Sequence, residues 1–193
     1  MNAIRRGLGT SPLGLKLLTP VALGCVAMVA AVSSSIDRLG GELAMDRLRQ
    51  RAEIVARTVT YAAETVRSET DFQRLVSSIG SEEGVTVIVA IGGDPLHVVA
   101  STKHAWLGRS LESIPIEDYG EDLREAIRTG RQHFHHHRES HEVDCSIPMA
   151  ADHTDSILRG GAVMVHIDAR PVERAVARLT QLIFLSGLIL ALT

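Results

Sequence analysis

The sequence predicts an α+β domain set between two apolar segments. Residues 36–68 repeat apolar side chains at helical spacing, whereas residues 85–168 contain β-branched runs of strand length separated by turn residues. Apolar stretches lie at both ends of the chain, from Leu15 to Ile36 and from Leu179 to Thr193. Because a membrane-spanning helix needs about 20 apolar residues, the first stretch is long enough and the second, at about 15, falls short.

The charges around the first apolar stretch predict its orientation. Arg5, Arg6 and Lys16 come before it or at its edge and no acidic residue does, so the N-terminus is expected in the cytoplasm. A cleaved signal peptide is the alternative, since it also begins with basic residues, although its apolar core is shorter. The expected order is a cytoplasmic N-terminus (1–14), a transmembrane helix (15–36), an extracytoplasmic domain (37–174) and a second transmembrane helix that the end of the chain truncates (175–193).

Composition excludes some partners of the middle region. All 23 acidic residues lie between Asp37 and Glu173, while four of the 20 basic residues lie outside 37–174, so the region is acidic and nucleic acid is not an expected partner. Cys25 falls in the first apolar stretch and Cys145 in a predicted strand, so no disulfide is expected between them. Cys145 is expected to be a small buried apolar residue.

Two helices are predicted before the strands. An amphipathic helix of about 50 Å should run from Ile36 to about Ser68, long enough to pack on its own domain and, around Leu39 and Leu43, on a second copy in a parallel homodimer. Ser68 should cap a shorter helix that ends at Gly80. The apolar positions of the long helix are Leu39, Leu43, Leu48, Ala52, Val55, Val59, Ala62 and Val66.

Five runs are predicted to form strands. The turn sequence Gly92-Gly93-Asp94-Pro95 joins the first two into a hairpin, and a helix from Glu121 to Thr129, closed by Gly130, precedes the third. The last run is apolar on both faces and should be central in the sheet, and a helix should start at Arg170. The runs are 85–91, 96–101, 131–138, 142–149 and 160–168.

The order of these elements and two local motifs resemble a known family. Val98-Val99-Ala100-Ser101 followed by Leu107-Gly108-Arg109-Ser110-Leu111, and Ser146-Ile147-Pro148-Met149 followed by residues 159–165, are similar to segments of the extracytoplasmic PAS-like sensor domains of the single Cache (PDC) family. The resemblance covers about residues 36–178. It implies an antiparallel five-stranded sheet with the long helix on one face and a ligand pocket on the other. Membrane receptors with this domain are histidine kinases, chemoreceptors or cyclic-dinucleotide enzymes.

The loop after the second strand is the expected ligand site. The citrate and dicarboxylate sensors of this family have an Arg-x-Ser-His-Pro loop here, and only Ser101 of this chain fits it, so a carboxylate ligand is not carried over. The position of the loop nevertheless makes five residues candidates for the pocket or its rim. The alternative is that Trp106 and Leu107 anchor the loop while Lys103 and Arg109 are solvated. The candidates are Ser101, Lys103, His104, Trp106 and Arg109.

A histidine-rich strand is the most unusual local sequence. Side chains alternate along a strand, so His133, His135 and His137 should share one face and could hold a divalent metal ion, with Asp144 or His153 completing the site. One alternative is a polar edge strand on which the histidines face water and Phe134 faces the core. Another is a proton sensor, because histidine titrates near pH 6.5.

No catalytic constellation is present, so the chain is not expected to be an enzyme. The carboxylates around Glu121 and Asp122 resemble a solvated first turn of a helix. The expected function is the ligand-sensing input region of a bacterial transmembrane signalling receptor, in the inner membrane with the sensor domain in the periplasm and the output domain absent from this chain. The alternatives are a complete membrane-anchored binding protein, a metal or pH sensor, and a periplasmic hydrolase.

Overall fold

The computed structural model describes residues 12–113, 119–137, 140–149 and 156–192. Its contacts divide the chain into two units. One unit spans Leu43–Val172 and the other combines Met1–Glu42 with Glu173–Thr193. Each unit is described by itself.

The smaller unit contains parts of two helices, α1 (Pro12–Thr65) and α4 (Arg170–Leu192). The Thr180 hydroxyl donates a hydrogen bond to Asp37 at 3.3 Å. Val29 lies so close to Gly187 that a Cβ there would come within 2.8 Å of its methyl group, so glycine permits the two helices to approach. Within the described residues, no helix is both long and apolar enough to cross a membrane. This finding gives no support to the transmembrane helices predicted at 15–36 and 175–193.

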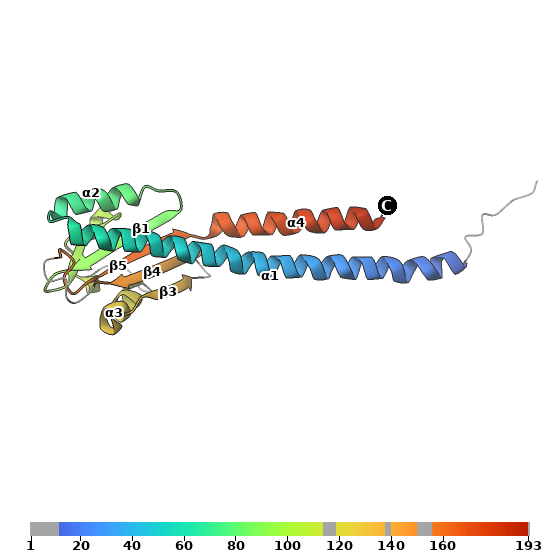
Figure 1. The fold of residues 1–193 in the computed structure, drawn as a ribbon, viewed down its shortest axis with the longest axis horizontal. Helices are drawn as coiled ribbons and strands as arrows, with labels where there is room; N and C mark the ends of the chain where they lie inside the picture. Colours follow the sequence, from blue (N-terminus) through green and yellow to red (C-terminus); the bar gives the residue numbers. More distant parts are fainter. Residues whose placement is uncertain (1–11, 114–118, 138–139, 150–155, 193) are drawn as a thin grey trace, which may run out of the picture. The chain divides into compact units, whose positions relative to one another are not determined.

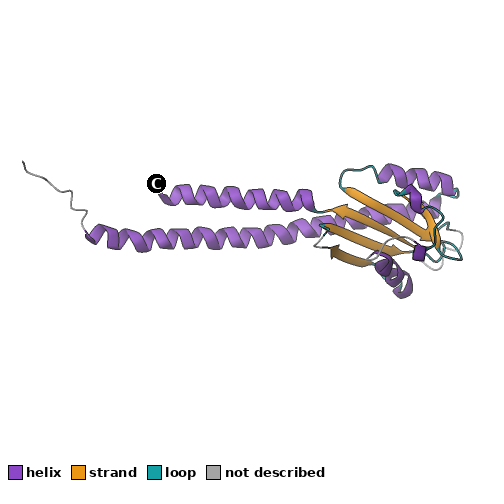
Figure 2. Cartoon of the chain, turned by 180° about the vertical axis from the view of Figure 1, so that it is seen from behind, coloured by secondary structure: helices purple, strands orange, loops and turns teal. Residues whose placement is uncertain are grey.

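The larger unit is built on a five-stranded antiparallel sheet (Figure 2). The strand order is β2-β1-β5-β4-β3, so β5 is central, as its apolar sequence on both faces predicted. The fold is therefore α+β, with five strands and a long N-terminal helix, which confirms that part of the predicted fold class. The strands are β1 (Val85–Gly92), β2 (His97–Ser101), β3 (His133–His137), β4 (Glu142–Pro148) and β5 (Ala162–Asp168).

One face of the sheet, here called the α1 face, packs against α1 and α2 (Figure 1). The part of α1 that begins at Leu48 buries Ala52, Val55 and Val59, as its apolar spacing predicted, but Leu39 and Leu43 are exposed. Helix α2 (Glu69–Ile79) begins as predicted, because the Ser68 hydroxyl accepts a hydrogen bond from the amide of Asp71 at 3.4 Å. The sheet contributes Ile88, Ala90, Val143, Cys145, Val163, Val165 and Ile167 to this core.

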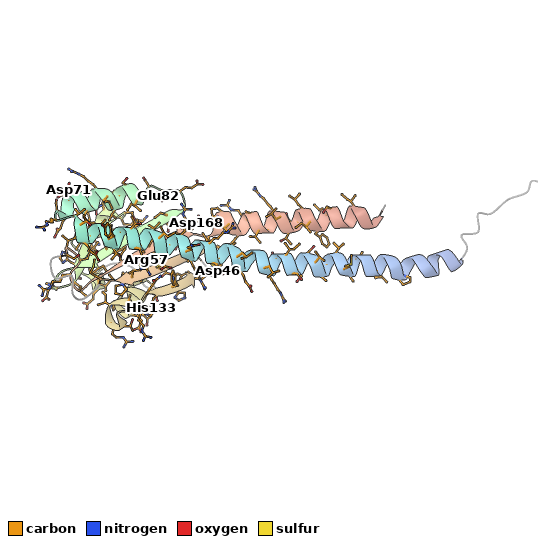
Figure 3. All side chains as sticks on the ribbon, in the orientation of Figure 1. Asp46, Arg57, Asp71, Glu82, His133 and Asp168 are labelled. Atoms are coloured by element: carbon orange, nitrogen blue, oxygen red, sulfur yellow. The ribbon has the colours of Figure 1, made fainter. Side chains whose placement is uncertain are left out.

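The opposite face, here called the α3 face, is covered in part by α3 (Tyr119–Thr129). Leu123 of this helix packs with Val89, Ile91, Val98 and Met164. This apolar core covers only part of the face, and polar side chains of β3, β4 and β5 occupy the rest. Among the residues labelled in Figure 3, Arg57 lies on α1, and His133 and Asp168 lie on strands β3 and β5 of the sheet.

Two glycines explain how β5 begins beside β1. Gly160 adopts the left-handed conformation, with φ of 67°, which favours glycine. A side chain on Gly161 would collide with the backbone of Ile91, so β1 and the start of β5 can approach only if this position lacks a Cβ. The Gly160-Gly161 pair therefore allows the backbone to turn and the central strand to start close to β1.

Candidate metal centre

The register of the sheet brings ionisable residues of three strands onto the α3 face. His135 of β3 lies opposite Asp144 of β4, and Asp144 lies opposite His166 of β5. Residues that face each other in neighbouring strands point to the same side of a sheet. His137 is two residues beyond His135 and therefore shares this face.

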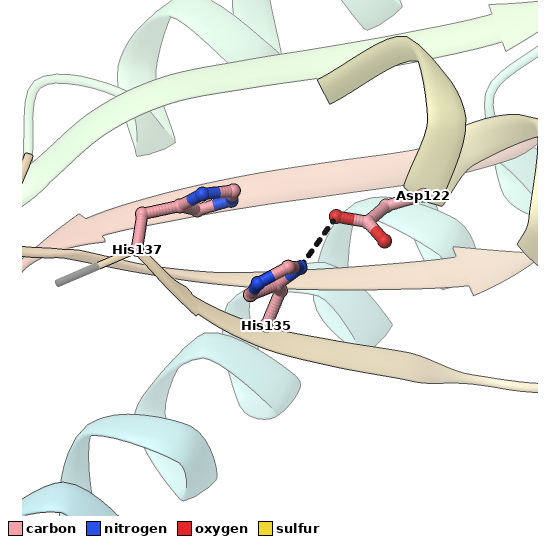
Figure 4. A group of neighbouring side chains, drawn as sticks. All are labelled: Asp122, His135 and His137. Carbon is pink, nitrogen blue, oxygen red and sulfur yellow. Dashed lines mark ion pairs between the residues drawn. The ribbon is translucent and has the colours of Figure 1, made fainter. Parts of the chain in front are cut away.

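Asp122 of α3 joins His135 and His137 in a compact group (Figure 4). Each of the three offers a ligand atom, and these atoms all lie within 4.8 Å of one another. His135 Nδ1 lies 3.4 Å from Asp122 Oδ2. The two imidazole rings are stacked with their centroids 4.3 Å apart. Imidazole nitrogen and carboxylate oxygen are common ligands of zinc and other divalent metal ions.

Asp144 lies beneath this group and is almost fully buried. Its Oδ1 is 3.5 Å from His137 Nε2, and its side chain is only 1% exposed. Burial, together with the negative charge of Asp122, raises the pKa of Asp144 from 3.8 to about 8. If the buried Asp144 carboxylate is ionised, a nearby positive charge is needed to offset the free energy lost when the charge leaves water.

His166 is the innermost histidine of the cluster. Its ring centroid lies 6.5 Å from that of His137, and its Nδ1 lies 3.9 Å from Glu142 Oε2. Burial and, next, the charge of His137 lower the pKa of His166 from 6.5 to about 3. The ring is therefore neutral at physiological pH, the form in which imidazole binds metals.

The structure brings two of the three predicted metal ligands together with a different third residue, Asp122. His135 and His137 come together, but His133 does not join them, because its Nε2 lies 3.1 Å from the Thr129 hydroxyl at the end of α3. His153, considered as a completing ligand, lies outside the described residues. Asp144, the other residue considered, lies in the cluster.

The predicted alternative of a polar edge strand with a buried phenylalanine is partly wrong. β3 is an edge strand, as that alternative required. His135 is exposed as well, with 56% of its side chain accessible. However, Phe134 is 39% exposed and does not face the core, while the side chain of His137 is only 14% exposed. The reason is that α3 lies over the histidine side of the strand, as its contacts through Asp122 and Thr129 show.

Asp122 was missed by the sequence prediction, which placed it in a solvated first turn. In the structure its side chain is 21% exposed and faces β3. The sequence contained one indication of this placement, because Asp122 lies four residues before Ala126 and seven before Thr129, on one side of a helix. In the structure Ala126 is fully buried. The spacing therefore places Asp122 on the inner face of α3.

The predicted ligand loop lies at another part of the larger unit. Ser101 ends β2, is buried, and its hydroxyl accepts a hydrogen bond from the Lys103 amide at 3.0 Å. Trp106 packs against the apolar core of the α3 face, whereas Lys103, His104 and Arg109 are exposed. The contact of Trp106 agrees with the alternative in which it anchors the loop. The ligand-binding role of Ser101, Lys103, His104, Trp106 and Arg109 stays a prediction.

Cys145 is buried on the opposite face from the metal centre. It follows Asp144 on β4 but belongs to the core of the α1 face, as predicted for a small buried apolar residue. Burial raises the pKa of the Cys145 thiol from 9.0 to about 12. Its sulfur is therefore a thiol at physiological pH and is directed away from the centre.

Compared with known proteins, the chain matches no protein-family model, and no curated protein is significantly similar to it in sequence. The fold and the site together define an α+β domain with a candidate metal centre between α3 and the edge of its sheet.

Proposed function

We propose that this domain binds a divalent transition-metal ion through Asp122, His135 and His137, and that it serves as the sensing region of a signalling receptor. The observation that carries the metal part is the convergence of three ligand atoms within 4.8 Å of one another. The atoms come from a helix, α3, and from the strand that follows it, β3, so the spacing of histidines along one strand does not by itself explain their convergence.

The chemistry of the donors selects the class of ion. Two imidazole nitrogens and a carboxylate oxygen suit zinc, nickel, copper(II), cobalt or iron(II), which are borderline in softness. Soft monovalent ions such as copper(I) prefer thiolate and thioether sulfur, and Cys145 belongs to the core of the opposite face. The proposed ligand is therefore a divalent ion of nitrogen and oxygen preference.

Binding at this place would join two elements. Asp122 lies on α3, whereas both histidines lie on β3, so an ion held by all three links the helix to the edge of the sheet. A ligand shifts a conformational equilibrium only by its differential affinity for the two states. An arrangement in which α3 lies against β3 would be favoured by the ion, and this is the change that a sensor would report.

The receptor part of the proposal is supported by the sequence. The element order and the two motifs resemble single Cache domains, and the basic N-terminus favours a membrane location with the domain in the periplasm. A reporter enzyme fused near residue 120 should be active only when it lies outside the cytoplasm. Cytoplasmic activity of that fusion would contradict the proposed location.

We further propose a parallel homodimer along α1. Leu39 and Leu43 are 60% and 65% exposed and lie four residues apart, so they share one face of α1 and could pack against a second copy. Cysteines introduced at these two positions should form disulfide cross-links between two chains under mild oxidation in membranes. Absence of cross-linking at every position from Ile36 to Leu48 would indicate a monomer.

The metal part is tested by thermal unfolding of the full chain in mild detergent. Zinc, nickel or copper(II) at a hundredfold excess over Kd should stabilise the protein by about 2.7 kcal/mol. For a chain of this size, a stabilisation of about 2.7 kcal/mol should raise the melting temperature by about 5–11 °C. The shift should decrease at about pH 5.5, because each imidazole must lose its proton before it binds.

The variants separate the proposed site from unspecific binding. His135→Ala with His137→Ala should abolish the shift, whereas His104→Ala, which removes an exposed histidine of another loop, should leave it unchanged. A shift that survives the double substitution would place the ion elsewhere. If pH moves the melting temperature through these histidines and metal does not, the cluster is a proton sensor.

A further inference from the structure

We infer that Asp144 is a fourth ligand of this centre, so that two carboxylates and two imidazoles hold the ion; the inference rests on the metal centre proposed above. Asp144 comes from β4, the strand that pairs with β3, and it lies directly opposite His135. The ligands would then come from three elements, α3, β3 and β4.

The position of the Asp144 carboxylate supports this assignment. Its Oδ1 lies 3.5 Å from Nε2 of His137, itself one of the three converging residues. This oxygen is buried, and among the described residues it meets no hydrogen-bond donor. Asp122 Oδ2 is in the same situation. Buried carboxylate oxygens normally accept hydrogen bonds or bind a metal, so two of them beside two imidazoles point to a ligand set.

The charges of the cluster favour a divalent ion. Within the described part of the chain, the only ion pairs of Asp122 and Asp144 are with His135 and His137, and neither carboxylate pairs with a lysine or an arginine. If Asp144 lost its proton on binding an ion, two ionised carboxylates beside two neutral imidazoles would carry a charge of about −2, which a divalent cation would neutralise. A monovalent ion would leave one negative charge uncompensated beside the buried carboxylate of Asp144.

With Asp144 as a ligand, the ion would be held by four protein side chains. Four protein ligands fill the tetrahedral shell of zinc, as in sites where the metal holds a fold together, whereas catalytic zinc sites keep one position open. The ion would then act as a clamp between α3, β3 and β4. This role fits sensing, because the clamp forms or dissolves with the concentration of the ion.

The test is zinc titration of the full chain in mild detergent, followed by calorimetry. Asp144→Asn keeps the size of the side chain and removes its charge, and should weaken zinc binding by at least about tenfold. Ser146→Ala is the matched control, because Ser146 is also buried, lies two residues further on the same face of β4, and has a hydroxyl without a hydrogen-bond partner among the described residues. This control should bind zinc as tightly as the unaltered protein does.

A second variant keeps the inference testable if Asp144→Asn folds poorly. Asp144→Cys supplies a thiolate at the same place and should shift the preference from zinc towards cadmium, a softer ion. Cobalt(II) gives a further readout, since its visible absorption is strong in a four-coordinate tetrahedral site. The absorption should be intense for the unaltered protein and weak for Asp144→Asn.

The outcomes distinguish the two claims. If the unaltered protein binds no metal, the metal centre and this inference both fail. If it binds zinc, and binding depends on His135 and His137 but is unchanged in Asp144→Asn, the centre stands and Asp144 is not a ligand. If Asp144→Asn and Ser146→Ala weaken binding equally, the effect is one of packing and the inference is overturned.

Discussion

The two faces of the sheet are built on different physical principles. The α1 face buries an almost uninterrupted set of aliphatic side chains beneath α1 and α2. The α3 face is apolar over β1 and β2, but beyond Met164 it carries Asp144, Ser146 and His166 in buried positions. Burying an ionisable group costs free energy because the group loses its contact with water, so these polar positions of the α3 face should contribute less stability than the aliphatic positions of the α1 face. The difference supports the proposal that the α1 face stabilises the fold and that the α3 face holds a ligand.

The largest expected effect is the loss of stability when a core residue of the α1 face is truncated. Phe72 is fully buried in its core, so Phe72→Ala should destabilise the protein by about 3–5 kcal/mol. Phe134→Ala is the matched control on β3, because Phe134 is 39% exposed and should cost about 1 kcal/mol or less. Urea unfolding monitored by circular dichroism measures both. Equal costs would show that the α1 face does not dominate stability.

The next effect concerns the charge buried on the α3 face. The folded-state pKa of Asp144 is raised from 3.8 to about 8, so the stability that this group contributes is complete below about pH 4 and is lost as the pH rises through 8. Asp144→Asn removes the ionisable carboxyl, so the variant should not lose this stability as the pH rises. Without metal, the variant should therefore gain stability relative to the unaltered protein as the pH rises, by up to about 1.4 kcal/mol per pH unit.

Urea unfolding at about pH 5 and about pH 8, with a chelator present, measures this difference. The pKa of His166 is shifted in the opposite direction to that of Asp144, so its contribution to stability depends on pH in the opposite sense. Its folded-state pKa is lowered to about 3, so its contribution is present above pH 6.5 and is lost as the pH falls through 3. A difference between Asp144→Asn and the unaltered protein that is independent of pH would contradict the buried-charge account.

The smallest expected effect is that of a substitution next to Asp144 on β4. Cys145 follows Asp144 but belongs to the α1 face, so Cys145→Ala should cost about 1 kcal/mol and leave the response to zinc unchanged. The thermal shift with zinc, measured for this variant beside Asp144→Asn, checks the division of β4 between the two faces. A loss of the zinc response in Cys145→Ala would mean that the two faces are coupled.

The sequence predicts the elements better than it predicts the centre. The central place of β5, the cap at Ser68 and the hairpin of β1 and β2 depend on local patterns, and the structure confirms each. The boundaries of β3 are shorter than predicted, and exposed Leu39 and Leu43 depart from the buried stripe of α1.

The centre depends on tertiary contacts that no local pattern contains. Alternation along β3 predicts that His133, His135 and His137 share a face, but the placement of α3 decides which of them lies beside Asp122. Thr129 at one end of the helix contacts His133, and Asp122 near the other end contacts His135. The sequence therefore identifies the strand that carries the histidines, and the packing of α3 decides which of them join Asp122 in the candidate centre.

The edge position of β3 determines how the cluster exchanges with solvent. Among the described strands β3 pairs only with β4, whereas β5 is paired on both sides, so local opening should require least free energy at β3. Such opening separates His135 and His137 from Asp144 and admits ions to an otherwise buried carboxylate. Hydrogen–deuterium exchange of the β3 amides should then slow as zinc is added, while the already slow amides of β5 change little. The strand that frays most readily would be the one that reports the ion.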